Sequence, residues 1–373
     1  MRSRNQQGVT NSLLAMMSAA VLLSVAVATY FLAAPSMPMA LAAEAGVQLP
    51  DNWKPFKQIS EYGLFADPAA QVPAEGVLPY DLTTPLFSDY STKYRFVWMP
   101  EGEAATYKGE ESFVFPVGTL LAKTFGYVDD LRDPSLGQTI IETRILMKSP
   151  EGWVVSVYIW NEDQTDAKLK VAGGRRDVTW THTDGSTKNL SYIIPNVNQC
   201  KGCHIVGEAI KPVGPKGMLL NKSYPYHDGA ANQLQRWASE GYLTDVPDDA
   251  PAVPVWDDPE TGTEAERARA YLEVNCAHCH RPEGPANTTG LDLRYGQEDP
   301  YAWGVGRTPV AAGRGAGDRL FDIVPGKPDE SILLFRLEST EPGIMMPELP
   351  RLMVHEEAVE LIRAWIEGLE EPA

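Results

Sequence analysis

The chain has 373 residues, of which 43% are hydrophobic and 22% are charged, and its formal net charge is −18. This size and composition predict about two globular domains, each large enough to fold without disulfides or a structural metal. The strong negative charge argues against nucleic acid and anionic lipid as partners.

The first 43 residues have the pattern of an export signal. Arg2 and Arg4 come first, an apolar run follows over residues 13–34, and small residues stand at Ala40 and Ala42. A basic start, an apolar middle and an A-x-A site are typical of a cleaved signal peptide. The apolar run is also long enough to span a bilayer, so an uncleaved membrane anchor is the alternative. In either case we predict that the rest of the chain lies outside the cytoplasm, in the periplasm.

The next part of the chain predicts β structure. Residues 44–80 are rich in Pro, Ala and Gly and predict an irregular segment. Residues 81–245 predict a β-rich domain, because short runs of β-branched and aromatic residues alternate with turn residues. The runs cover residues 93–99, 112–125, 139–148, 152–160, 177–184 and 189–195. Their spacing favours an antiparallel, sandwich-like sheet.

The last part of the chain predicts helices. Residues 246–262 are rich in Pro and Asp and predict a linker. In residues 263–373, Thr263 and Glu266 form a capping box, Pro328 begins another helix, and apolar residues recur at helical spacing near the C-terminus. The expected fold class is α+β and multidomain: an antiparallel β-rich domain that ends with a cysteine motif, followed by an all-α domain.

All four cysteines fall into two C-x-x-C-H motifs. The motifs consist of Cys200, Cys203 and His204, and of Cys276, Cys279 and His280. This spacing is the attachment site of c-type haem. Two thiols can each add to one vinyl group of the same porphyrin, and the following histidine is placed to reach the iron as an axial ligand. We therefore predict two covalently bound haem c groups.

Three other uses of the cysteines fit less well. A thioredoxin-like motif requires a βα junction, which neither motif has. A single zinc site would combine pairs that lie 76 residues apart and would leave the repeated histidine unexplained. A disulfide within either motif would close a very small, strained loop. His278, between two cysteines, is interpreted as a surface residue near the haem edge.

Residues 260–373 resemble class I cytochrome c. The segments that carry the resemblance are YLEVNCAHCH, DIVPGKPDESILLFRL, GIMMPELP and the C-terminal amphipathic helix. The resemblance implies that Met346 is the distal ligand of the second haem, with Met345 as the alternative. It also implies a hydrogen bond from His280 to the carbonyl of Pro285. For the first haem the candidate distal ligands are Met218, His227 and His182, or the iron has no sixth ligand.

Nearly all of the chain after the signal resembles a family of exported two-haem c-type cytochromes with no assigned reaction. The stretches involved include TPLFSDYSTKYRFVWMPEG, GWVVSVYIWNEDQTDA and IPNVNQCKGCH. Members of this family often accompany an exported parallel β-helix protein, which is therefore a possible partner beside other redox proteins.

The favoured function is the transfer of single electrons between redox partners rather than conversion of a substrate. One alternative is a two-haem oxidoreductase, such as a peroxidase, with one open haem site. Another is a binding module, in which the β-rich domain recognises a ligand, residues 158–167 contribute to its site, and the haems carry electrons away. The sequence contains no catalytic triad, phosphate-binding loop or zinc-hydrolase motif.

Overall fold

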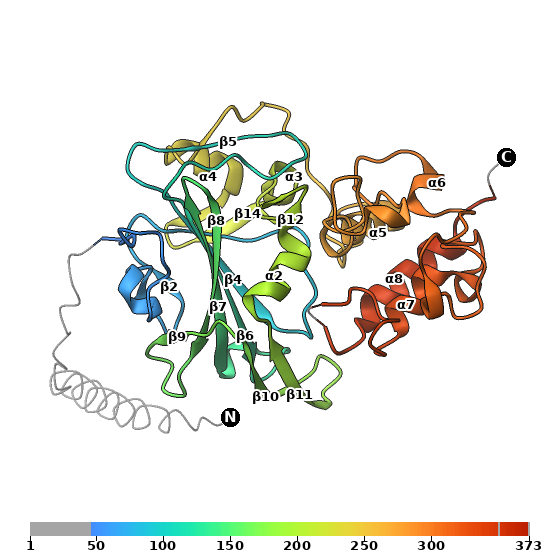
Figure 1. Cartoon of the computed structure of the whole chain (residues 1–373), viewed down its shortest axis with the longest axis horizontal. Helices are drawn as coiled ribbons and strands as arrows, with labels where there is room; N and C mark the ends of the chain where they lie inside the picture. The colour runs from blue at the N-terminus through green and yellow to red at the C-terminus, as the bar shows by residue number, and fades with distance from the viewer. Residues whose placement is uncertain (1–45, 350, 372–373) are drawn as a thin grey trace, which may run out of the picture. The chain divides into compact units, whose positions relative to one another are not determined.

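The computed structural model describes residues 46–349 and 351–371 (Figure 1). The predicted signal segment, residues 1–43, lies outside the described residues. Residues Ala45–Ala373 form one compact unit. In the described part of the chain, no helix is long and apolar enough to cross a membrane.

The largest element is a six-stranded sheet with the order β3-β4-β6-β7-β8-β9, in which all neighbours are antiparallel. Its strands are β3 (Leu78–Tyr80), β4 (Thr92–Trp98), β6 (Leu120–Val128), β7 (Gln138–Ser149), β8 (Gly152–Trp160) and β9 (Ala167–Leu169). One face packs on the preceding segment around Tyr62, Phe96, Ile145 and Trp160. The other face forms one wall of a cavity.

Among the described residues, ten other strands form two-stranded sheets. The antiparallel pairs are β1 (Phe65–Asp67) with β2 (Val72–Pro73), β10 (Gly174–Thr181) with β11 (Thr187–Ile194), β12 (Ile205–Val206) with β13 (Ala209–Ile210), and β14 (Ser223–Tyr226) with β15 (Gly229–Asn232). β5 (Ala105–Thr106) pairs with β16 (Leu243–Thr244) in parallel. The β10–β11 hairpin packs on the large sheet through Trp180 and Tyr192, which share a core with Tyr127 of β6.

The α-helices are α2 (Val197–His204), α3 (Gly217–Leu220), α4 (Gln233–Ser239), α5 (Glu264–Asn275), α6 (Pro300–Trp303), α7 (Ile332–Glu338) and α8 (Glu356–Glu367). Single 3-10 turns occur at Ile59–Tyr62, Pro134–Leu136, Asn287–Thr289, Gly313–Ala316 and Pro328–Glu330. The predicted capping box of Thr263 and Glu266 is present at the start of α5. Leu272 of α5 and Ile362 and Trp365 of α8 belong to one apolar core.

The expected fold class is wrong in two respects. The antiparallel sheet is present, but it is one sheet with a hairpin packed on it rather than a sandwich of two large sheets. The following part is not an all-α class I cytochrome c domain: the described residues are 27% strand and only 22% helix. Between α5 and α7, the described residues form only α6, 3-10 turns and isolated parallel bridges such as Val305–Ile323. Glycines with positive φ, including Gly304 and Gly317, interrupt the helical pattern there.

Candidate functional site

The first cysteine motif lies on α2, directly after the sheet-forming part of the chain. Asn196 begins the helix: its side chain accepts a hydrogen bond from the Gln199 N–H at 2.9 Å, and Gln199 Oε1 accepts one from the Asn196 N–H at 2.9 Å. In a helix, residues three and four positions apart lie on the same face. Cys200, Cys203 and His204 therefore present their side chains on one side of α2.

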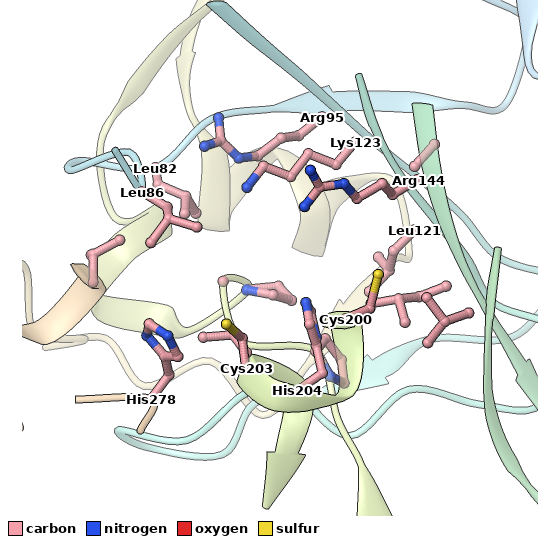
Figure 2. Close-up of a pocket in the computed structure, with 18 of the residues that line it drawn as sticks. Leu82, Leu86, Arg95, Leu121, Lys123, Arg144, Cys200, Cys203, His204 and His278 are labelled. Atoms are coloured by element: carbon pink, nitrogen blue, oxygen red, sulfur yellow. The ribbon is translucent and has the colours of Figure 1, made fainter. Parts of the chain in front are cut away.

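All three motif residues line a cavity of about 1190 Å³, a volume that includes space open to solvent (Figure 2). His204 Nδ1 lies 2.9 Å from the backbone oxygen of Lys211, which can only accept a hydrogen bond. This contact keeps the proton on Nδ1 and leaves Nε2 free to bind a metal. Burial lowers the pKa of His204, which favours the neutral ring that ligation requires.

The wall opposite α2 is formed by the large sheet and carries cations. Arg95 of β4, Lys123 of β6 and Arg144 of β7 all line the cavity. In Figure 2 their side chains lie across the cavity from Cys203 and His204. Burial, with the nearby arginines adding, lowers the pKa of Lys123 well below its usual value. Sequence analysis missed this wall, although a charged residue inside a strongly apolar strand is a signal for it.

The second motif follows α5 directly. The N–H groups of Cys279 and His280 donate to the Cys276 carbonyl at 3.0 and 2.9 Å, which folds the motif into a compact turn. Cys276, His280 and Met346 line a cavity whose volume of about 700 Å³ includes space open to solvent. These three residues and Cys279 also line an adjoining cavity of about 830 Å³.

His280 is held by a hydroxyl group rather than by the expected carbonyl of Pro285. His280 Nδ1 lies 3.1 Å from Thr289 Oγ1, and that hydroxyl donates its own proton to the Ala286 carbonyl at 2.8 Å. Thr289 therefore accepts from His280, and Nε2 of the ring is again free. Burial, with His278 and Arg336 adding, lowers the pKa of His280 to about 4.

The structure distinguishes between the two candidate methionines at the second motif. Met346 lines both cavities, whereas Met345 is packed in the interior at 7% exposure and lines neither. The backbone of Met346 is fixed, because its N–H donates to the Arg336 carbonyl at 3.0 Å. Its own carbonyl accepts from Arg351 Nη2 at 2.7 Å.

None of the three candidate distal ligands for the first motif lines its cavity. Met218 belongs to the apolar core around Trp237. His182 is buried against Tyr90, and His227 is exposed in the turn between β14 and β15. Apart from the motif itself, Lys123 and His278 supply the lysine or histidine nitrogens on this cavity's described lining.

The first and second cysteine motifs lie next to each other in the structure. The possible ligand atoms of Cys203, His278 and Cys279 all lie within 4.8 Å of one another. The expectation that His278 is a surface residue is wrong, because it is 7% exposed and its Nδ1 is buried without a hydrogen-bond partner. The nearby Cys279 thiol and the His278 ring stabilise a thiolate at Cys203 and lower the pKa of the Cys203 thiol.

In both motifs the cysteines are free, and they line a cavity together with a histidine whose Nδ1 is engaged by an oxygen. These residues fit the donors that a covalent haem would use. Comparison with known proteins gives no relative on which to rest an assignment: no family model matches the chain, and no similar curated protein or solved structure is detected.

Proposed function

We propose that the chain is an exported two-haem c-type cytochrome that transfers single electrons between redox partners. Cys200 and Cys203 would hold the first haem, with His204 as its axial ligand. Cys276 and Cys279 would hold the second, with His280 and Met346 as its axial ligands. The observation that carries the proposal is the same at both motifs: a histidine whose Nδ1 is engaged by an oxygen faces a cavity that the motif cysteines also line.

The residues of the chain have separate tasks in this function. The thiols anchor each group covalently, and Lys211 and Thr289 orient the two imidazole rings. The bound iron supplies the one-electron chemistry. Thioether ligation by Met346 would raise the potential of the second site above that of a site without it.

Transfer between the two sites within one chain is supported by the contact of the motifs. Cys203 and Cys279 each belong to a different motif and lie in one cluster. The groups attached to them would therefore approach each other closely. The donor and acceptor would be other redox proteins, and the net charge of −18 favours a basic docking surface on them. The exported β-helix protein suggested by the sequence is one candidate partner.

The test is a carbon monoxide difference spectrum of the reduced protein, with covalent haem counted by denaturing mass spectrometry. Two haems per chain and no spectral change support a carrier with two six-coordinate irons. A chain that acquires no covalent haem in a host able to mature c-type cytochromes would refute the proposal. Cys200→Ser with Cys203→Ser should leave one haem, and so should Cys276→Ser with Cys279→Ser.

A second candidate function is favoured by the lining of the first cavity, which contains no methionine among its described residues. An iron there would lack a thioether ligand and could leave one position open. The chain would then be an oxidoreductase of the peroxidase type, with the second haem as its electron supply. Carbon monoxide binding to one of two haems, together with peroxide-dependent oxidation of a reduced dye, would favour this alternative over a pure carrier.

A further inference from the structure

The cavity at the first motif has an unusual charge distribution. Arg95, Lys123 and Arg144 are direct cross-strand neighbours, because Arg95 pairs with Lys123 and Lys123 pairs with Arg144. Like charges directly opposite each other on adjacent strands are destabilising. The one carboxylate on the described lining, Glu273, is already paired with Lys216 at 2.5 Å. The repulsion among Arg95, Lys123 and Arg144 is therefore not fully offset by carboxylates on the cavity lining.

Two of the three cations have a carboxylate partner. Arg144 binds Glu142 at 2.6 Å and Arg95 binds Asp81 at 2.5 Å. Arg95 is nevertheless 4% exposed and has a buried Nη2 without any hydrogen-bond partner. Lys123 takes part in no ion pair among the described residues. Lys123 is partly exposed, and its ammonium lies 4.8 Å from the centroid of the Phe125 ring. The buried Arg95 Nη2 is therefore the group that lacks an acceptor, and an anion in the cavity would supply one.

The same sheet face is apolar beside the cationic row. Leu121 of β6, Leu146 of β7 and Val155 of β8 line the cavity next to it. Leu121 pairs with Leu146, and Leu146 pairs with Val155, so these residues form a second row parallel to the first. The wall thus offers an apolar strip and, along one edge of it, a strip of hydrogen-bond donors with positive charge.

A haem has the complementary pattern. Its macrocycle is apolar, its two vinyl groups lie on one half, and its two propionate carboxylates lie on the other half. Attachment of the vinyl side to Cys200 and Cys203 on α2 directs the carboxylates away from that helix. Figure 2 shows the three cations across the cavity from Cys203, whereas Cys200 lies near Leu121 of the sheet.

We propose that Arg95, Lys123 and Arg144 form a carboxylate-binding wall that receives the propionates of the haem attached at Cys200 and Cys203. This inference rests on the proposed function. Arginine binds a carboxylate through two parallel N–H groups, and lysine adds a point charge. The same wall would bind a small free carboxylate if no propionate reached it, so the experiment must separate these two sources.

Lys123→Gln is the informative variant. A carboxylate in the cavity would keep Lys123 protonated, so the substitution removes one charge, and it leaves no described carboxylate without its ion-pair partner. A cation near the iron opposes the extra positive charge of the ferric state. Its loss should therefore shift the ferric–ferrous equilibrium of one haem at least tenfold toward ferric, which is about 59 mV lower in potential. Lys123→Arg should restore most of the shift. Lys168→Gln, an exposed position on β9, is the matched control and should change nothing.

The readouts are redox titration and the covalent haem count. If the ferric–ferrous equilibrium constant of Lys123→Gln stays within twofold of wild type, with two haems attached, the inference is overturned and the proposed function is left intact. A wild-type chain without a haem at the first motif would refute the proposed function itself. Saturable binding of succinate to the two-haem protein, abolished in Lys123→Gln, would show that the wall serves free carboxylates, and the propionate assignment would be wrong.

Discussion

The ion pair between Lys216 and Glu273 joins the segment before α3 to α5. The two charged atoms are 2.5 Å apart, and the side chains are only 8% and 1% exposed. Glu273 also accepts a hydrogen bond from the Tyr295 N–H at 2.8 Å. Lys216→Met would leave this carboxylate buried without its counter-charge. We expect the free energy of unfolding to fall by about 3–5 kcal/mol, the usual effect of breaking one half of a buried pair.

The assay is urea unfolding followed by tryptophan fluorescence, at pH 7 and with the haem content of each variant matched. The double variant Lys216→Met with Glu273→Leu removes both charges and should recover to within about 1 kcal/mol of wild type. Lys327→Met is the control, because Lys327 pairs with Glu330 at the surface, where the side chains are 57% and 61% exposed. It should change stability by less than about 1 kcal/mol.

Two results would contradict this account of the pair. If Lys216→Met alone lowers the free energy of unfolding by less than about 1 kcal/mol, the Glu273 carboxylate is not desolvated as its burial indicates. If the double variant is as unstable as the single one, the loss comes from packing of the side chains and not from an uncompensated charge.

Three further predictions concern the second motif. Met346→Ala should open the iron to carbon monoxide and lower its potential, whereas Met345→Leu should do neither; the reverse pattern would reassign the ligand. Thr289→Val removes the acceptor for His280 Nδ1, weakens the basicity of the ring and should raise the potential by up to about 59 mV, with unchanged haem content. Burial raises the pKa of Asp322 to about 6. Folding therefore favours its protonated form, and its stabilising contribution is complete below about pH 4 and lost as pH rises through 6. Relative to Asp322→Asn, the free energy of unfolding of the wild type should fall by about 2 kcal/mol between pH 4 and pH 7. The same dependence of stability on pH in both proteins would refute this.

The strands were predictable where the local pattern decides the structure. The predicted runs at residues 139–148 and 152–160 correspond to β7 and β8, which are joined by a short turn. The capping box at Thr263 likewise depends on neighbours three residues apart. The helices predicted near Thr263, after Pro328 and at the C-terminus correspond to α5, α7 and α8. The all-α fold class failed because the residues between α5 and α7 form mostly loops, whose glycines with positive φ exclude continuous helix.

The parts of the site that depend on strand register were not predictable. Arg95, Lys123 and Arg144 are far apart in sequence and become a row only when β4, β6 and β7 pair in one register. No periodicity in a single strand encodes that register. The preference for Met346 over Met345, by contrast, came from the resemblance of the sequence, and Met346 is the one that lines the two cavities of the second motif.

The contact between the motifs bears on how the two predicted domains are related. Glu273 and Val274 of α5, and His278 of the second motif, line the cavity of the first motif. The wall that closes the first cavity is therefore supplied by residues beyond the predicted linker at 246–262. A sheet fragment that ended in this linker would retain α2 and its thiols but would expose the cavity and lose the partner of Lys216. The two cysteine motifs are thus better described as parts of one structural unit than as two independently folding sites. That arrangement also places Cys203 and Cys279 in one cluster. If haems are bound as proposed, an electron would pass between them without leaving the chain.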